Sequence, residues 1–459
     1  MTKNEIYNKL IAMKAENVNA SKTLTTSAKL TDYAHLVRKG VQYGETVDIW
    51  TDAFQAAIDE NEVVIIPSSD VPYYTDTTVI LPSDRRIEAY GATVQLIEGA
   101  TLLLLRNASV ANGTHMPIKD VPKNRNITVC GGTWAESHKT KAGYGISGKL
   151  DEEYTYGGVS SCFYFGNMEG LNLLDLHFVH AGGFSVQVGN VANAVFENIE
   201  FTGCFADGLH INGNCENIYA CNIRGEVGDD LVALNMYDWL NSSVNFGPTK
   251  CVWCEKLVLF ESSAYKALRI LPGTYTFDDG SVVDCSLTDA VIRNVRGVNT
   301  FKLYFQSASY HYEFEEPEPG SSGSANNIYL EDIKADLTPI DMFSEYTDSH
   351  PVKGSCAVFE LGSDIGSVYF DNIDVTLHRD EYPFSYIVCI GPKSARKGGR
   401  EYFNPDMSSH AEKVAFSNIR VNGETVTDIG EFVREIVFDD IYSDGRSSGK
   451  GSIDKIILK

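Results

Sequence analysis

The feature that most constrains the fold is a short motif that recurs along most of the chain. Its pattern is N-I/V-x-I/V/F-x-N/D-I, as in "ANAVFENIEFTGC" and "CENIYACNIRGEV", at offsets near 22 residues, or near 40 where loops are inserted. A strand–helix–strand unit needs about 30 residues or more, and no copy carries the L-x-x-L-x-L or helical segment of a leucine-rich repeat. A rung of three short strands fits. We therefore predict an all-β fold, a right-handed parallel β-helix of about ten or more rungs.

Within each predicted coil, apolar positions should point inward and polar residues should occupy the corners. Stacked rungs lie about 4.8 Å apart, so inward side chains form ladders and corner Asn side chains bridge neighbouring rungs. The predicted inward positions are Val195, Ile199, Ile218, Ile223, Val291 and Val295, and the predicted corner residues are Asn198, Asn222, Asn294 and Asn372.

The first 45 residues lack this repeat, so we divide the chain into an N-terminal arm or attachment module (residues 1–45) and a β-helix domain (residues 46–459). The arm should hold a helix over residues 2–16, with Thr2 and Glu5 at capping-box spacing. A second short helix is expected over residues 31–39. The apolar side of the first helix comprises Ile6, Leu10, Ile11 and Met13, and Gly40 is expected to end the second.

Just after the boundary, "WTDAFQAAIDENEVVIIP" reads as one helix followed by one strand. Thr51 can cap that helix. Its apolar side should comprise Phe54, Ala57 and Ile58, and the strand should cover residues 63–66.

Charge excludes several classes of partner. The formal net charge is −24 with a pI near 4.8, so nucleic acid and anionic membranes are excluded as partners, and a neutral or lightly charged carbohydrate is favoured. No segment is apolar enough to enter a bilayer, and no cofactor is expected. The N-terminus has no apolar signal core, which predicts a cytoplasmic protein or an extracellular one carried in a phage particle.

The ten cysteines show no disulfide spacing and should be free buried thiols. The one CxxC, Cys251 to Cys254, has no second pair or His at zinc spacing, so it is weak grounds for a metal or redox site.

An acidic cluster is predicted from the repeat itself. Asp207-Gly208 precedes Asp229-Asp230 by 22 residues, which is one rung. Residues one rung apart lie above each other on one face, so the three carboxylates should converge, and at least one should keep its proton near neutral pH. Glycoside hydrolysis needs such a set: one carboxylic acid protonates the leaving oxygen, and another carboxylate activates water or attacks the sugar.

These motifs resemble the family 28 glycoside hydrolases, the polygalacturonase family within the pectin-lyase-like β-helix superfamily. That family carries an N-T-D-G motif and, one rung on, a G-D-D motif. Here Asp207-Gly208 matches the D-G part of the first, and Gly228-Asp229-Asp230 matches the second. The resemblance implies that Asp230 is the general acid or its close partner, that Asp207 and Asp229 activate water, and that the reaction inverts the anomeric centre.

Two elements of the family pattern are altered in this chain. No His occupies residues 241–254, where the family's G-H-G motif should fall, and the R-I-K motif reads Arg269-Ile270-Leu271. The missing Lys normally meets a substrate carboxylate, so a substrate other than galacturonate is favoured. The predicted substrate-binding residues are Arg269, His210, Lys266, Tyr237, Asp238, Trp239 and Tyr265.

Three functions stay open at this point. The first is a glycoside hydrolase or polysaccharide depolymerase. The second is a tail-spike-like receptor-binding protein of a bacteriophage, suggested by the helical arm ahead of the β-helix; a trimer would favour it and a monomer the free enzyme. The third is a Ca²⁺-dependent polysaccharide lyase, since Asp229 beside Asp230 could bind a hard cation.

Overall fold

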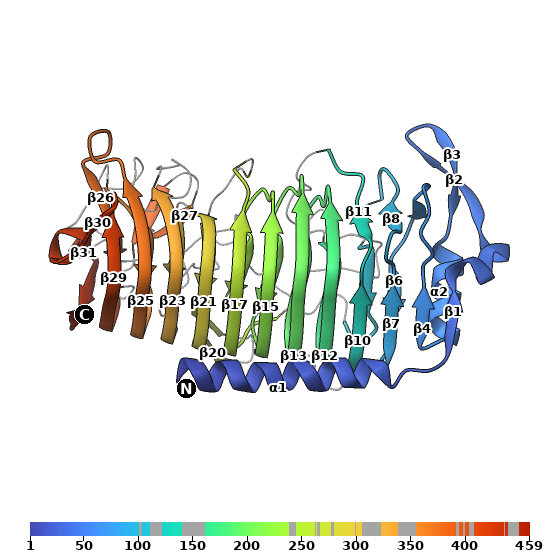
Figure 1. The fold of residues 1–459 in the computed structure, drawn as a ribbon, viewed down its shortest axis with the longest axis horizontal. Helices are drawn as coiled ribbons and strands as arrows, with labels where there is room; N and C mark the ends of the chain where they lie inside the picture. The colour runs from blue at the N-terminus through green and yellow to red at the C-terminus, as the bar shows by residue number, and fades with distance from the viewer. Residues whose placement is uncertain are drawn as a thin grey trace.

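The computed structural model of the chain is a right-handed parallel β-helix, as the repeat predicts (Figure 1). Its coils stack in parallel register along one long axis, from the N-terminal elements to the C-terminus. The structure describes residues 1–100, 103–110, 122–139, 161–237, 245–261, 263, 267–276, 280–298, 300–304, 323–337, 355–391, 394–397, 400–403, 408–435, 437–438 and 449–459.

Each coil contributes strands to three faces. We call the first the site face, because the strands that follow the acidic residues belong to it. Its strands are β6 (Val79–Leu81), β9 (Leu105–Asn107), the first parts of β12 (Ser161–Val179) and β13 (Phe184–Thr202), β14 (Leu209–Asn212), β16 (Val232–Asn235), β18 (Ala267–Leu271), β22 (Thr300–Tyr304), β24 (Ser355–Gly362), β26 (Phe384–Ile390) and β31 (Val433–Glu435).

The second face, called the helix face, lies beneath the N-terminal helix. Long strands such as β12 and β13 turn two corners and contribute to all three faces. The helix face contains β1 (Ser27–Lys29), β4 (Val63–Ile65), β7 (Arg85–Glu88), β10 (Asn124–Cys130), β15 (Cys215–Gly225), β17 (Thr249–Leu259), β21 (Leu287–Val298), β23 (Ser324–Leu337), β25 (Asp364–Leu377), β29 (Ser409–Val421) and β34 (Ile456–Leu458).

The third face begins with β3 (Glu45–Ile49), β5 (Tyr73–Thr75), β8 (Thr93–Leu96) and β11 (Thr133–Ala135) and continues in the last residues of β12 and the longer strands after it. Short elements flank the solenoid. They are β2 (Arg38–Gln42), β19 (Gly273–Thr276), β20 (Val282–Cys285), β27 (Ser394–Lys397), β28 (Arg400–Phe403), β30 (Glu424–Thr425), β32 (Val437–Phe438), β33 (Gly449–Ile453) and the 3-10 turn η5 (Gly430–Phe432).

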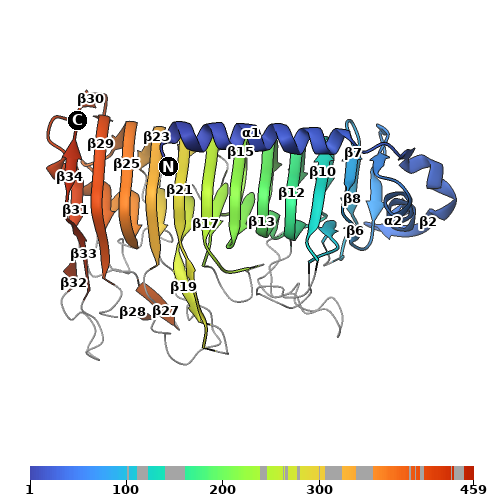
Figure 2. The same cartoon turned by 90° about the horizontal axis from the view of Figure 1, so that it is seen from below.

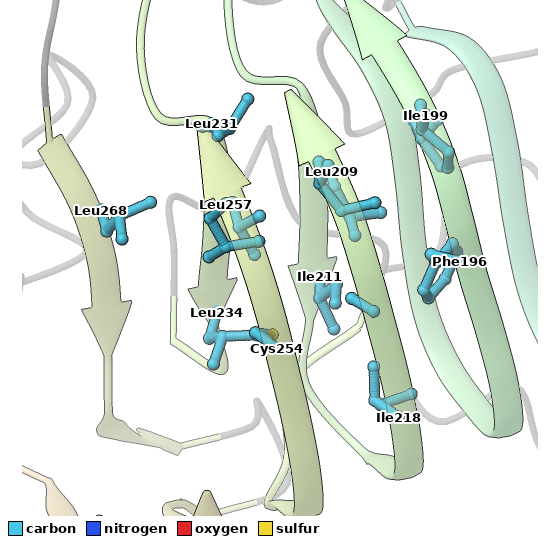
Figure 3. Close-up of a cluster of buried hydrophobic side chains, with 14 of the residues drawn as sticks. Phe196, Ile199, Leu209, Ile211, Ile218, Leu231, Leu234, Cys254, Leu257 and Leu268 are labelled. Carbon is cyan, nitrogen blue, oxygen red and sulfur yellow. The ribbon is translucent and has the colours of Figure 1, made fainter. Parts of the chain in front are cut away.

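The core fills the space that the three faces enclose. Ladders of aliphatic and aromatic side chains from neighbouring rungs meet there, among them Leu209, Leu234 and Leu257 (Figure 3). The predicted inward positions Ile199, Ile218, Ile223 and Val295 are confirmed.

The inward prediction is wrong for Val195 and Val291, which point outward on the helix face and are buried by the N-terminal helix instead. Successive residues of a strand point to opposite sides. Their neighbours Phe196 and Ile292 take the inside.

Asparagine ladders hold the corners, as predicted. Asn198 and Asn222 adopt left-handed backbone angles, with φ of 56° and 57°, which Asn tolerates better than most residues. The Asn222 side chain donates to Asn198 Oδ1 at 2.9 Å, and Asn198 donates to Asp175 one rung earlier at 2.7 Å. Asn294 and Asn372 share the same backbone conformation. Each rung is thus tied to the next by side-chain amides.

The first helix, α1 (Lys3–Lys22), runs along the solenoid across the strands of the helix face (Figure 2). Its predicted capping box between Thr2 and Glu5 is confirmed, and the helix continues past the predicted end at residue 16. Ile6, Leu10 and Met13 are buried against Val195, Tyr219, Trp253 and Val291. Ile11 was expected on this apolar side but is 36 % exposed.

Ion pairs fix α1 along its length. Lys14 Nζ lies 2.6 Å from Glu197 Oε2, Lys9 Nζ lies 3.2 Å from Glu216 Oε1, and Lys3 pairs with Glu331. The N-terminal amino group lies 2.6 Å from Asp289. The helix therefore packs on the β-helix; its predicted role in attachment stays a prediction. No helix among the described residues is long and apolar enough to cross a membrane.

The prediction of a second helix over residues 31–39 is wrong in its latter half. The 3-10 turn η1 (Leu30–Leu36) is followed by β2, which contains Gly40 and pairs antiparallel with β3. A Cβ on Gly40 would lie 2.5 Å from Ile49 Cγ1, so glycine is needed for the hairpin's close approach. The predicted boundary after residue 45 falls inside this hairpin.

The predicted helix after the boundary is α2 (Thr51–Glu60), and Phe54, Ala57 and Ile58 are buried as expected. The expected capping role of Thr51 is wrong. The N-cap residue is Trp50, and the Thr51 hydroxyl donates to Asp76 Oδ1 at 2.8 Å.

All nine cysteines whose side chains the structure describes are buried and free, including Cys251 and Cys254. This confirms the predicted thiols for the described residues.

Candidate active site

The acidic residues lie in two turns that lead into neighbouring strands of the site face. Asp207 precedes β14, and Asp229 and Asp230 precede β16, one rung later. Two glycines let these turns approach closely. A Cβ on Gly228 would lie 2.3 Å from Phe205 O, and one on Gly208 would lie 2.8 Å from Leu231 O. The Gly208 amide donates to Asp230 O at 2.9 Å, which ties the two turns together.

The predicted convergence of the three acids is confirmed. One carboxylate oxygen from each of Asp207, Asp229 and Asp230 lies within 4.8 Å of the others. The Asp230 backbone N–H donates to Asp207 Oδ1 at 3.1 Å. The period of the repeat therefore does place these acids in one cluster, while their catalytic role stays a prediction.

Arg269 provides the positive charge beside the cluster. It extends from β18, two rungs beyond His210, with which it shares one column on the site face. Its Nη2 donates to Asp229 Oδ1 at 3.1 Å, and its Nε lies 2.9 Å from Asp230 Oδ2. With Arg269 8 % exposed, one guanidinium neutralises part of a buried three-carboxylate charge.

His210 lies directly beside Asp207. Its Nδ1 is 2.6 Å from Asp207 Oδ2, and its ring stacks on Phe184 with centroids 3.8 Å apart. The ring is 1 % exposed. The predicted sugar-binding residue thus contacts a candidate catalytic carboxylate, and its Nε2 lies 3.1 Å from the Asn212 amide.

A divalent cation fits this cluster poorly. Ca²⁺ takes six to eight oxygen ligands at about 2.3–2.6 Å, and three carboxylates could supply several of them. Arg269, however, already contacts two of the three carboxylates within 3.1 Å. A dication bound there would lie next to a guanidinium, and their repulsion disfavours it.

The burial of the three acids limits how a substrate can reach them. Asp207 is 1 % exposed, Asp230 is 0 % exposed and Asp229 is 8 % exposed. Any substrate must therefore reach the cluster first at Asp229.

Of the remaining predicted substrate-binding residues, the structure describes Tyr237 and does not describe the other four. Tyr237 lies in the apolar core at 1 % exposure, with its ring 5.9 Å from Phe246, which does not fit the predicted contact with sugar. Leu271, at the position of the family's Lys, is buried in register with Asn235. Lys266, Asp238, Trp239 and Tyr265 lie outside the described residues.

A cavity of about 600 Å³ lies near the cluster, toward the N-terminal end of the solenoid. Phe205, two residues before Asp207, forms part of its wall. The other described residues around it are Tyr43, His138, Lys139 and His180. None of these residues was predicted from the sequence. Tyr43, for example, belongs to a hairpin far from the acids along the chain.

Sequence reasoning also missed the buried amides beside His210. Gln187 precedes His210 by 23 residues and pairs with it across β13 and β14, and Asn212 follows two residues later on the same side of the strand. The rung period together with the two-residue alternation of a strand could have identified both.

Comparison with known proteins finds no family for the chain but does find similar solved structures. No protein-family model and no curated protein sequence matches the chain. Among solved structures, a hyperthermoactive exopolygalacturonase from Thermotoga maritima is 12 % identical over 98 % of this chain and 96 % of its own, with a TM-score of 0.46. An endo-xylogalacturonan hydrolase from Aspergillus tubingensis is 12 % identical over 90 % and 99 %, with a TM-score of 0.44.

A bacteriophage HK620 tailspike mutant in complex with a pentasaccharide is 10 % identical, with a TM-score of 0.49, over 86 % of this chain and 67 % of the tailspike chain. At these identities the similarity describes the fold. The chain is a parallel β-helix protein similar in fold to polygalacturonases and phage tailspikes.

Proposed function

We propose that the chain is a glycoside hydrolase that cleaves an oligo- or polysaccharide by acid–base catalysis. The observation that carries the proposal is the clustering of Asp207, Asp229 and Asp230 from adjacent rungs within 4.8 Å, beside Arg269. Two carboxyl groups in different protonation states are what glycosidic cleavage requires.

The contacts suggest a role for each acid. Asp207 accepts from His210 through one oxygen and from the Asp230 N–H through the other, so both of its oxygens act as hydrogen-bond acceptors. Asp229 and Asp230 lie side by side, which disfavours ionising both, and Arg269, in contact with both, offsets part of that repulsion. We assign Asp230 as the general acid, and Asp207 with Asp229 as the groups that activate water.

The stereochemical outcome is part of the proposal. Oxygens within 4.8 Å are closer than the roughly 6.5–9.5 Å typical of inverting enzymes, and nearer the roughly 5 Å of retaining ones. The separation alone therefore does not favour inversion. We propose inversion on the family resemblance, and ¹H NMR of the first-formed anomer measures it.

The substrate class follows from charge. Leu271 replaces a Lys that would meet a substrate carboxylate, and the chain carries a net charge of −24. Both features favour a neutral or lightly charged glycan over a polyuronate.

The test is release of reducing ends from a glycan panel by wild type and Asp230→Asn. Loss of a general acid typically lowers the rate by about 10²–10⁴-fold. Asp380→Asn, an exposed Asp in a turn far from the cluster along the chain, is the matched control and should retain full activity. Equal activity of wild type and Asp230→Asn on the cleaved glycan would contradict the assignment.

The second candidate is a tail-spike-like receptor-binding protein, catalytic or silent. Residues 3–22 pack along the solenoid through apolar contacts and ion pairs, and a role of this stretch in attaching a fibre stays a prediction. The mass of the purified protein in solution separates the two: a stable trimer favours the tail protein, and a monomer favours the free enzyme.

A further inference from the structure

A row of buried polar side chains, one hydroxyl and two amides, leads along the site face to His210. Ser161, Gln187 and Asn212 lie on successive rungs, and all three are 0 % exposed. Ser161 Oγ donates to Gln187 Oε1 at 2.9 Å, and Gln187 Nε2 donates to Asn212 Oδ1 at 3.0 Å. The row ends at His210 Nε2, 3.1 Å from Asn212 Nδ2.

A backbone carbonyl fixes which way the Asn212 amide points. Asn212 Nδ2 also lies 3.3 Å from Asn235 O, and a carbonyl oxygen accepts hydrogen bonds but cannot donate one. A flipped amide would place two oxygens against each other there and would also lose the donor from Gln187. The Asn212 –NH₂ group therefore faces both Asn235 O and His210 Nε2.

This orientation selects one form of the imidazole. Because Asn212 donates to Nε2, that nitrogen is the acceptor, and the ring proton is on Nδ1. Nδ1 then donates to Asp207 Oδ2 across 2.6 Å. The ring is neutral, and its Nδ1–H makes Asp207 Oδ2 a hydrogen-bond acceptor.

The surroundings of the ring are consistent with this form. The Phe184 ring covers one face of the imidazole, and Gln187 and Ala233 flank His210 on the neighbouring rungs. The charged groups nearby are Asp207 and, beyond it, Asp229, Asp230 and Arg269. Protonation of Nε2 would require the Asn212 amide to rotate, which would break its bonds to Gln187 and Asn235.

We propose that Asn212, held by Gln187 and Asn235, is a positioning residue that sets the tautomer of His210 and thereby fixes Asp207 as the base of the cluster. This assignment of a base rests on the proposed hydrolase function; the tautomer itself does not. The row thus keeps Asp207 Oδ2 as a hydrogen-bond acceptor, while Arg269 contacts the neighbouring Asp229 and Asp230.

The experiment is ¹⁵N NMR of the full chain labelled at histidine, at pH 7, where the two ring nitrogens report their own protonation. His210→Gln assigns the signals. In wild type, Nε2 of His210 should be unprotonated and Nδ1 protonated. In Asn212→Asp, a carboxylate faces Nε2, so both nitrogens should become protonated. Asn190→Asp, a buried corner amide outside the row, should leave His210 unchanged.

A wild-type spectrum with Nε2 protonated would overturn the inference, even if Asn212→Asp does not fold. An unchanged His210 signal in a folded Asn212→Asp would overturn it too. On a glycan that wild type cleaves, Asn212→Asp should lower kcat by about 10–100-fold, as loss of a supporting contact usually does, and should alter the pH profile. Absence of hydrolysis with the predicted tautomer intact would refute the proposed function and the assignment of Asp207 as a base, and would leave the tautomer of His210 standing.

Discussion

The most quantitative prediction concerns Glu136, which follows β11 near the candidate site. Its side chain is 0 % exposed, its Oε2 accepts from the Gly182 N–H at 2.7 Å, and its Oε1 has no hydrogen-bond partner among the described residues. Burial raises the pKa of Glu136 from an ordinary value of 4.5 to about 7, and the Gly182 bond only partly opposes this. The folded protein therefore holds a proton that the unfolded chain releases.

The sign and size of the effect follow from proton linkage. The proton stabilises the fold fully below pH 4.5, and the contribution is lost as the pH rises to about 7. A tenfold difference in proton affinity between the folded and unfolded states corresponds to about 1.4 kcal/mol. The free energy of unfolding should therefore fall by about 3 kcal/mol over this pH window. In Glu136→Gln, which carries no titrating proton, this loss should be absent.

Denaturant midpoints of wild type and Glu136→Gln between pH 4 and 8 measure the difference. The stability of wild type relative to the variant should fall by about 3 kcal/mol across the window. Burial lowers the pKa of His138, whose Nε2 lies 3.7 Å from Glu136 Oε2, and that histidine is present in both proteins. Glu98→Gln, an exposed Glu paired with Lys139, is the control and should show the wild-type slope. Parallel curves for wild type and Glu136→Gln would refute the reasoning.

Three further perturbations test other parts of the structure. Leu10→Ala opens a gap between α1 and the helix face and should cost about 2–5 kcal/mol of unfolding free energy, whereas exposed Ile11→Ala should cost under about 0.5; denaturant midpoints compare them. Gly228→Ala should displace Asp229, because its Cβ would meet Phe205 O, and abolish release of reducing ends. Excess EDTA should leave the release of reducing ends unchanged; a loss restored by Ca²⁺, with unsaturated products of β-elimination, would instead support the lyase alternative.

The rung period predicted most of the fold because stacking in a solenoid is nearly one-dimensional. A spacing of 22 residues is enough to bring Asp207 over Asp229 and Asp230, whatever the rest of the chain does. The same reasoning places the corner ladder of Asn198 and Asn222.

Residues that face the core and residues that face outward were harder to tell apart in the sequence where both sides of a strand are apolar. Val195 and Val291 are as hydrophobic as true core residues because α1 covers them, and that cover comes from a segment more than 170 residues earlier in the chain. The burial of the acids was likewise not predicted, because it depends on contacts that the local sequence pattern does not encode. Tyr237 was predicted to bind sugar because it is aromatic and close to the acids in the sequence, but its ring is buried in the core.

The strongest argument for function lies in the contrast between two kinds of corner. Elsewhere the rungs are joined by Asn side chains such as Asn198 and Asn222, which bridge neighbouring coils without burying charge. At Asp207, Asp229 and Asp230 the chain instead buries three carboxylates and balances them with Arg269. Charges removed from water cost several kcal/mol each unless compensated, and apolar or neutral replacements are often at least as stable. Neutral corners such as Asn198 and Asn222 need no such compensation, so the buried acidic cluster is consistent with the proposed catalytic role.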